Sequence, residues 1–328
     1  MEFMDCKDVF LSKPLVSVVV PIYNAGEYLR PCLDTLVNQT LHDIEIICVL
    51  DCPTDGSDRV VEEYSNQDDR IIVIKNEKNL HIGESRNIGI RVARGEFIGF
   101  SDHDDTRELD MYEKLYLLAE QGKHDVVLSG KFVMDNFKGG FKNDDLLKRC
   151  LHALICRNGT AHVTPHLFRK KFIEENGLSF VDTKVIFGED ILFNIDVLCC
   201  LKDNRQLTVC PELFYHHIET GKNTADLPSY CSSPKLSGFI NKCRVILQEC
   251  GFYDELKDDM SVLLLRMSYT ILKKDIKREG YRKAMHDFKA IVVGDVFCRQ
   301  LILGMSVTMK GLTPPKRAFA LWLKWLCR

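Results

Sequence analysis

Short apolar runs alternate with helix-like segments through the first 130 residues of the chain. The first run, residues 17–22, is rich in β-branched residues, as is typical of a strand buried on both faces. Together the runs predict strands at residues 17–22, 44–50, 71–74, 97–100 and 126–128. The segments between them predict helices over residues 26–39, 55–64, 84–93 and 111–120. This alternation predicts an α/β fold with a mainly parallel central sheet and helices on both faces.

The pattern changes in the second half of the chain. It loosens after residue 130, and from about residue 232 apolar residues recur every three or four positions. That spacing predicts helices over residues 234–250, 253–277 and 281–292. The α/β region is therefore followed by a helical C-terminal region.

Polar side chains follow three of the predicted strands. Tyr23 and Asn24 follow the first strand, Asp51 follows the second, and the acids of residues 102–105 follow the fourth. Ligands of parallel sheets bind at the carboxyl ends of the strands. We therefore expect these residues to meet along one rim of the sheet.

The acids Asp102, Asp104 and Asp105 directly follow a buried strand. Such a group can cap the next helix, act as a general acid and base, or hold a hard cation. Asp110 stands just before the helix of residues 111–120 and already supplies a cap. We therefore predict a site for a hard cation, Mg²⁺, Mn²⁺ or Ca²⁺, because hard cations prefer oxygen ligands.

Two further rim residues suit a nucleotide. Tyr23 can stack on a base, or it can pack in the core with its hydroxyl at the edge. Asp51 can accept a hydrogen bond from a base imide or a ribose hydroxyl, or it can simply begin the turn of residues 51–54. The stretch after the first strand has no glycine-rich phosphate loop, which excludes a dinucleotide fingerprint and a P-loop.

Composition adds few constraints to the 328-residue chain. The formal net charge of −3 gives no electrostatic reason to expect nucleic acid. The 14 cysteines lack C-x-x-C spacing and are interpreted as reduced core thiols. The first residues show no secretory pattern, and no apolar run is long enough to cross a bilayer. We expect a soluble, cytoplasmic protein.

Several motifs, in order, resemble one known family. They are "VSVVVPIYNAGEYLRPCLDTLVNQTLHDIEIICVLDCPTDGSDRVVEEY", "NLHIGESRNIGI", "GEFIGFSDHDD" and "FGEDILF". These stretches are similar to family 2 glycosyltransferases, most strongly over residues 15–121 and again over 165–218. The resemblance implies the GT-A nucleotide-sugar fold, a divalent cation and inversion at the anomeric carbon.

The resemblance also assigns roles to individual residues. Tyr23 matches the residue that stacks on the nucleobase, Asp51 an acid that contacts uracil, and Arg86 an arginine that faces the nucleotide. The predicted nucleotide-sugar contacts are Pro21, Tyr23, Asn24, Asp51, Arg86 and Asp102. The predicted metal ligands are Asp104 and Asp105. Asp190 is predicted to be the catalytic base, with Glu189 beside it, although both acids also suit the start of a helix.

The chain also departs from the family pattern. Leu50 and Cys52 replace the usual residues around Asp51, His103 replaces a small residue, and residues 215–226 lack the arginines often found there. A second function therefore stays open, that of a nucleotide-sugar-binding or polysaccharide-assembly protein without turnover. A nucleotidyltransferase is disfavoured because the glycine-rich, basic opening of that class is absent.

Two further segments carry candidate chemistry. His216 and His217 are neighbours, so only one of them faces the site if the segment is a strand. We predict His216 as a third metal ligand or a phosphate contact. The tail from residue 296 to 328 contains no acid and includes Trp322 and Trp325 among basic residues. Its last helix either lies on an anionic membrane surface or docks on its own domain.

The sequence therefore predicts an inverting glycosyltransferase with two regions. Residues 1–230 form the GT-A domain, with a nucleotide-binding half at about 15–130 and an acceptor-side half at 131–230. Residues 231–328 form the helical region with its basic tail. The donor is a nucleotide-sugar, UDP-linked, and the acceptor is a growing polysaccharide or a lipid-linked glycan. A peripheral contact with the inner face of a membrane would suit the second acceptor.

Overall fold

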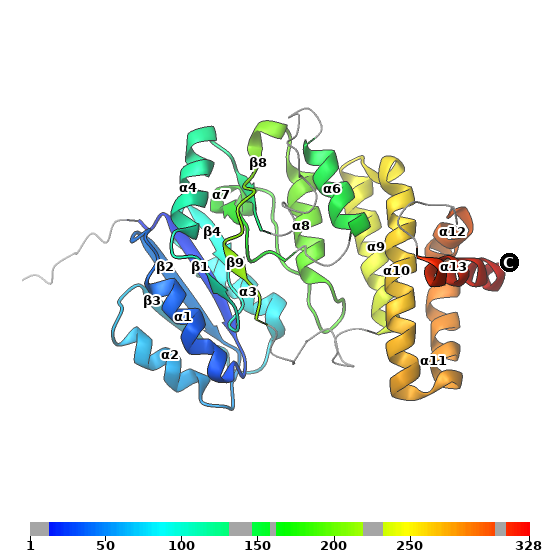
Figure 1. Cartoon of the computed structure of the whole chain (residues 1–328), viewed down its shortest axis with the longest axis horizontal. Coiled ribbons are helices and arrows are strands. Elements are labelled where there is room, and N and C mark those ends of the chain that lie inside the picture. Colours follow the sequence, from blue (N-terminus) through cyan, green and yellow to red (C-terminus); the bar gives the residue numbers. More distant parts are fainter. Residues whose placement is uncertain (1–12, 131–145, 158–161, 219–231, 306–312) are drawn as a thin grey trace, which may run out of the picture.

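A computed structural model describes residues 13–130, 146–157, 162–218, 232–305 and 313–328 (Figure 1). Its central sheet has seven strands in the order β3-β2-β1-β4-β7-β6-β8. Their bounds are β1 Val16–Ile22, β2 Ile44–Leu50, β3 Ile71–Lys75, β4 Phe97–Phe100, β6 Val126–Leu128, β7 Leu167–Arg169 and β8 Leu207–Val209. A small second sheet pairs β5 (Thr106–Arg107) with β9 (Tyr215–His216).

The register confirms the predicted mainly parallel sheet. β1 runs parallel to β2 and β4, and β2 runs parallel to β3. Among the described strands of this sheet, β7 alone is antiparallel to its neighbours β4 and β6. All five predicted strands are present, whereas the short strands β7 and β8 lie in the part of the sequence where the pattern loosens.

Successive residues of a strand point to opposite sides of the sheet, and the buried strands carry apolar side chains on both sides. Helices cover both faces. Val18 and Val20 of β1 face a core shared with α1, α2 and α4, while Val19 faces a core shared with α3, α6 and α8. The bounds are α1 Leu29–Val37, α2 Ser57–Ser65, α3 His81–Val92, α4 Met111–Gly122, α6 Leu146–Arg157, α7 Lys170–Glu175 and α8 Glu189–Cys200.

Several predicted helix boundaries were wrong by two or three residues, for local reasons. Residues 26–28 form a separate turn before α1 begins. α2 begins at Ser57 because the Asp55 carboxylate accepts hydrogen bonds from the Ser57 amide and hydroxyl at 3.0 and 2.6 Å. The predicted cap of α4 was also wrong: Asp110 stands at the N-cap position but forms no cap hydrogen bond and pairs instead with Lys114 at 3.0 Å.

The C-terminal helices stand side by side at one end of the molecule (Figure 1). They are α9 Ser233–Glu249, α10 Tyr253–Glu279, α11 Tyr281–Phe288, α12 Val296–Gly304 and α13 Pro314–Cys327. One buried apolar cluster runs from Val19 in the sheet through Phe193 on α8 to Phe239 on α9 and Leu323 on α13. The helical region therefore shares a core with one face of the sheet. None of the described helices is long and apolar enough to cross a membrane.

Candidate active site

Three parallel strands end at the same rim of the sheet. Ile22 at the end of β1 lies opposite Leu50 at the end of β2, and Val19 lies opposite Phe100 at the end of β4. The segments that follow these strands therefore emerge together. This register brings residues 23–24, Asp51 and residues 101–105 to one edge, as the sequence predicts.

Asp51 lies against the start of α3. Its carboxylate accepts hydrogen bonds from the amides of Leu80 and His81 at 2.7 and 2.8 Å, and from the Asn76 side chain at 2.8 Å. Asp51 is 3% exposed. The acid therefore fixes the N-terminus of α3, which explains why that helix begins three residues before its predicted start. A nucleobase contact for Asp51 stays a prediction.

The residues after β1 occupy the outer part of the rim. Tyr23 is 46% exposed, so its side chain does not fill the core, which was the alternative to base stacking. Asn24 accepts a hydrogen bond from the Thr54 amide at 2.7 Å and so ties together the loops after β1 and β2. Pro21 is buried in β1, and its carbonyl lies 3.0 Å from His103 Nδ1.

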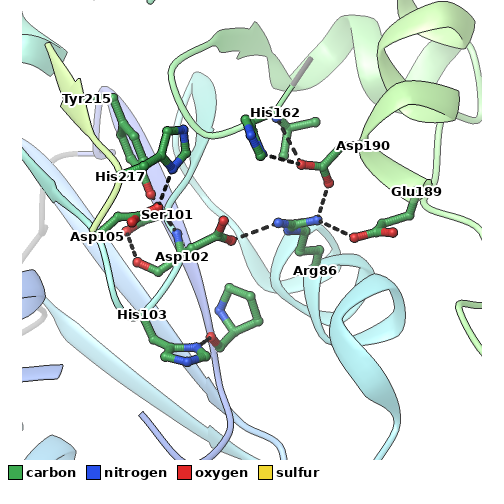
Figure 2. A network of polar contacts seen from close by, with 12 residues as sticks. Arg86, Ser101, Asp102, His103, Asp105, His162, Glu189, Asp190, Tyr215 and His217 are labelled. Carbon is green, nitrogen blue, oxygen red and sulfur yellow. Dashed lines mark hydrogen bonds and ion pairs between the residues drawn. The ribbon is translucent and has the colours of Figure 1, made fainter. Parts of the chain in front are cut away.

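Arg86 on α3 stands at the centre of the site (Figure 2). Its guanidinium is 1% exposed and reaches Asp102 at 2.8 Å, Asp190 at 2.5 Å and Glu189 at 3.5 Å. Asp102 follows β4, whereas Glu189 and Asp190 form the first turn of α8. One buried cation thus joins the strand rim to the acidic pair predicted to contain the catalytic base. Both acids lie in the first turn of α8, so they also suit the start of that helix, as the alternative interpretation expected.

The charges of this network support one another. Burial alone would lower the pKa of Arg86, but attraction to Asp190, Asp102 and Glu189 outweighs it, so the pKa lies above its ordinary value. Burial alone would raise the pKa of Asp102, and the neighbouring Arg86 instead holds it below its ordinary value. Arg86 and Asp102 are therefore both charged at neutral pH. A buried group of this kind depends on all its partners, because removing one leaves charge uncompensated.

A glycine allows α3 to approach the sheet closely enough to deliver Arg86. A Cβ atom added at Gly89 would lie 2.2 Å from Cγ1 of Val19, well inside van der Waals contact. Any side chain at this position would push α3 away from β1. Because Arg86 lies one turn earlier on the same helix, its reach toward Asp102 depends on this contact.

Asp104 and Asp105 differ in their surroundings. Burial raises the pKa of Asp104. The nearby His103 opposes this, but the charges of Asp102 and Asp105 raise the pKa further, so it lies above its ordinary value. A cation would relieve this crowding of negative charge. Asp105 is 4% exposed, and its carboxylate already has two hydrogen-bond partners. These are the Ile218 amide at 2.9 Å and His217 Nδ1 at 2.8 Å.

The predicted preference for His216 over His217 is not supported by the geometry. His216 pairs with Thr106 across the small sheet, and its Nε2 lies 2.7 Å from Glu108. His217 faces the acids instead and contacts Asp105. Burial would lower the pKa of His217, but its hydrogen bond to Asp105 raises it overall. One of the two neighbours thus faces the acids, as expected of a strand, but it is His217 rather than His216.

Three site residues were missed by sequence reasoning. His162 lies 3.8 Å from Asp190, and its ring is 4.4 Å from that of His217 (Figure 2). The Tyr215 hydroxyl accepts a hydrogen bond from the Asp102 amide at 2.9 Å, and the buried Arg107 donates to Ser101 at 2.7 Å. Their positions depend on chain crossings that no local pattern marks. Residues 219–226, part of the arginine-poor segment, lie outside the described residues.

The acids suit a hard cation in chemistry, although the described residues do not form a complete cage. Among them, no three histidine, cysteine or acidic side chains converge in a metal-binding arrangement. Asp104 is the carboxylate whose surroundings best fit a cation, and Asp105 would first have to release a partner. The assignment of metal ligands stays a prediction.

Comparisons with known proteins agree with this geometry. The family model described as "Glycosyl transferase family 2" matches residues 17–177. Glycosyltransferase EpsH of Bacillus subtilis is 37% identical over 93% of this chain and 89% of its own length. The chain belongs to glycosyl transferase family 2. EpsJ, another glycosyltransferase of the same organism, is 29% identical to this family 2 chain over 81% of the chain and 82% of its own length.

Solved structures confirm the GT-A fold. The crystal structure of Staphylococcus aureus TarS residues 1–349 with UDP-GlcNAc matches with a TM-score of 0.68 at 19% identity, over 94% of this chain and 89% of that one. The mannosyltransferase PcManGT of Pyrobaculum calidifontis, solved with GDP-Man and Mn²⁺, matches with a TM-score of 0.53 at 14% identity, over 96% and 87%. These structures confirm the predicted nucleotide-sugar fold, and the family assignment makes the protein a glycosyltransferase.

Proposed function

We propose that this family 2 glycosyltransferase moves a sugar, with inversion, from a UDP-linked donor to a hydroxyl of a polysaccharide or a lipid-linked glycan. The observation that carries the proposal is the shared Arg86, which holds Asp102 of the strand rim and Asp190 of α8 on one buried cation. Arg86 thus positions two carboxylates, of which Asp102 would serve the donor and Asp190 the acceptor.

The donor would lie along the rim of the sheet. Tyr23 offers an exposed ring for base stacking, worth about 1–3 kcal/mol. Asp51 Oδ2 accepts one amide bond, so it retains capacity for the imide of a uracil. The TarS structure with UDP-GlcNAc supports a UDP donor. A poly(ribitol-phosphate) β-glucosyltransferase of Bacillus spizizenii, 30% identical over 62% of this chain and 32% of its own length, supports a polysaccharide acceptor.

The residues that would hold Mn²⁺ or Mg²⁺ are Asp104, then Asp105, with His217 in the place predicted for His216. A bound cation supplies positive charge to the departing diphosphate. Asp102 lies beside these acids, and its carboxylate accepts a hydrogen bond from Arg86 instead of facing the cation position. Asp102 would therefore contact the ribose or the sugar of the donor. The Mn²⁺ of the PcManGT structure supports the choice of metal.

Asp190 is the proposed base on the acceptor side. One of its oxygens contacts Arg86 and the other accepts only a long bond, 3.3 Å, from the Val163 amide. An ionised Asp190 can take the proton of an acceptor hydroxyl as that oxygen attacks the anomeric carbon. One base suffices for a single displacement, and general base catalysis contributes about 10²–10⁴-fold. Glu189 would help to keep Arg86 in place.

A donor screen with two variants tests the proposal. Purified protein would be supplied with UDP- and GDP-sugars, Mn²⁺ or Mg²⁺ and candidate acceptors, and release of nucleoside diphosphate would be measured beside donor binding. We expect Asp190→Asn to lower kcat by about 10²–10⁴-fold while leaving the donor Kd nearly unchanged. Asp196→Asn is the matched control, because Asp196 lies on the same helix and lines a separate cavity with Lys242.

The possible results separate the alternatives. Full activity in Asp190→Asn would contradict the assignment of the base. Donor binding by the unaltered protein without transfer to any acceptor would favour the second function, a nucleotide-sugar-binding or assembly protein. If the acceptor is lipid-linked, a cytoplasmic enzyme would have to bind the inner face of a membrane to reach it. The C-terminal helices are the surface proposed for that contact.

A further inference from the structure

The last helix, α13, presents two different faces. Ala320, Leu323 and Cys327 are buried against the rest of the helical region. Leu321 and Trp325 point the other way and are 57% and 70% exposed. The two alternatives considered for the tail are therefore compatible, because docking uses one face and leaves the opposite face uncovered.

The uncovered face combines apolar and basic side chains. Arg317, Leu321, Trp325 and Arg328 follow one another at spacings of four, four and three residues, which places them on one side of the helix. The two arginines are exposed and stand at either end of the apolar pair. An exposed tryptophan and leucine flanked by cations are the features of a helix that lies in a membrane interface.

Helix stability does not account for these charges. Lys324 and Arg328 near the C-terminus suit the helix dipole, but Arg317 stands near the N-terminus, where a positive charge is unfavourable. Among the described residues, Arg317 and Arg328 form no ion pair, and residues 296–328 contain no acid. The face therefore attracts an anionic partner. A second copy of the chain is a poor one, because a two-fold contact would bring the same arginines together.

We propose that this face of α13 binds an anionic lipid surface. Leu321 and Trp325 would enter the boundary between headgroups and acyl chains, while Arg317 and Arg328 would contact lipid phosphates. α13 lies at the end of the molecule opposite the sheet, so the site would remain open to solvent and acceptor while the helix is bound (Figure 1). The inference goes beyond sugar transfer and is tested without measuring it.

Vesicle flotation of the full chain provides the first test. We expect at least tenfold more protein on vesicles of phosphatidylcholine with phosphatidylglycerol than on phosphatidylcholine alone. The double variant Leu321→Gln, Trp325→Gln should lose at least nine-tenths of this binding, and Arg317→Gln with Arg328→Gln should abolish the preference for anionic lipid. Leu117→Gln is the matched control, since Leu117 on α4 is also an exposed leucine, at 47% against 57% for Leu321.

Fluorescence provides a second readout. The chain has two tryptophans, so Trp322→Phe leaves Trp325 as the sole reporter. Its emission should shift to shorter wavelength when anionic vesicles are added. Failure of the unaltered protein to float, floating without this shift, or equal binding to neutral vesicles would overturn the proposal. So would a dimer, seen by sedimentation without lipid, that disappears in the Leu321→Gln, Trp325→Gln variant.

Discussion

The two sides of the Arg86 network contain the same chemical groups but are held in place differently. On the rim, Asp51 and Asp102 follow parallel strands, and backbone hydrogen bonds fix both: amides donate to the carboxylate of Asp51, and the amide of Asp102 donates to Tyr215. On the other side, Asp190 contacts Arg86, accepts one long bond from the Val163 amide and lies 3.8 Å from His162. The rim acids are thus placed by the sheet itself. α8 packs on the sheet through buried apolar side chains such as Phe193, but the carboxylate of Asp190 is oriented mainly by Arg86.

Replacing Arg86 is the most direct way to break this comparison. Arg86→Ala would leave Asp102, Asp190 and Glu189 with uncompensated charge in a buried site. We expect a loss of about 3–5 kcal/mol in the free energy of unfolding, measured by urea titration. Arg91→Ala is the control on the same helix, because its ion pair with Glu84 is exposed, and it should cost less than about 1 kcal/mol. Similar losses in the two variants would contradict the central role of Arg86.

A pair of neighbouring histidines tests the geometry of the rim. His217 contacts Asp105, whereas His216 pairs with Glu108 at the surface. We expect His217→Ala to lower kcat/KM by about 10–100-fold, the usual effect of removing a partner of a metal site. His216→Ala should leave kcat/KM within about threefold, since an exposed pair contributes little. The reverse order, found under saturating Mn²⁺, would favour His216 as the residue that serves the metal.

The pH dependence of stability tests a buried histidine where β7 begins, beside the carboxyl end of β4. His166 precedes β7, and its Nδ1 accepts a hydrogen bond from the Ser129 amide at 3.1 Å. Burial lowers the pKa of His166 to about 3, against an ordinary value of 6.5. Between these values the unfolded chain binds the extra proton, so stability rises with pH and is lost as pH falls below about 6.5.

The size of this effect can be isolated with a variant. From pH 7 to pH 5 the contribution of His166 to the free energy of unfolding should fall by about 2 kcal/mol. His166→Gln should remove that part of the pH dependence, while His42→Gln, at an exposed position, should retain it. Urea titrations at the two pH values measure the difference. An unchanged pH dependence in His166→Gln would contradict the buried, neutral state of this histidine.

The two sides also differ in how far the sequence could predict them. The position of the rim residues can be predicted from buried β-branched runs such as 17–22. Residues that follow parallel strands lie together at the carboxyl edge of the sheet. Asp51, Asp102 and Tyr23 could therefore be placed together from the strand pattern alone. Arg86 and Asp190 were singled out only through the family resemblance, since helical spacing alone does not tell which residues meet across a fold.

The remaining residues depended on chain crossings that carry no local pattern. Tyr215 and His217 reach the acids because β9 pairs with β5, and each of these strands has only two residues. His162 is brought to Asp190 by a segment without periodicity. A hydrophobic pattern predicts an element only if the element is long enough to show an alternation of apolar and polar residues. Strands of two residues, such as β5 and β9, are too short for this.

An acid at a helix start provides the smallest predicted effect and shows how position alone misleads. Asp110 stands before α4 as Asp190 stands at the start of α8, yet Asp110 caps nothing and forms an exposed pair with Lys114. We expect Asp110→Ala to change the free energy of unfolding by less than about 0.5 kcal/mol and to leave transfer unaltered. Asp55→Ala is the comparison, because Asp55 accepts bonds from Ser57 and the Gly26 amide and should cost about 1 kcal/mol. Equal losses in urea titrations would mean that sequence position, rather than a formed hydrogen bond, determines what an acid at a helix start contributes.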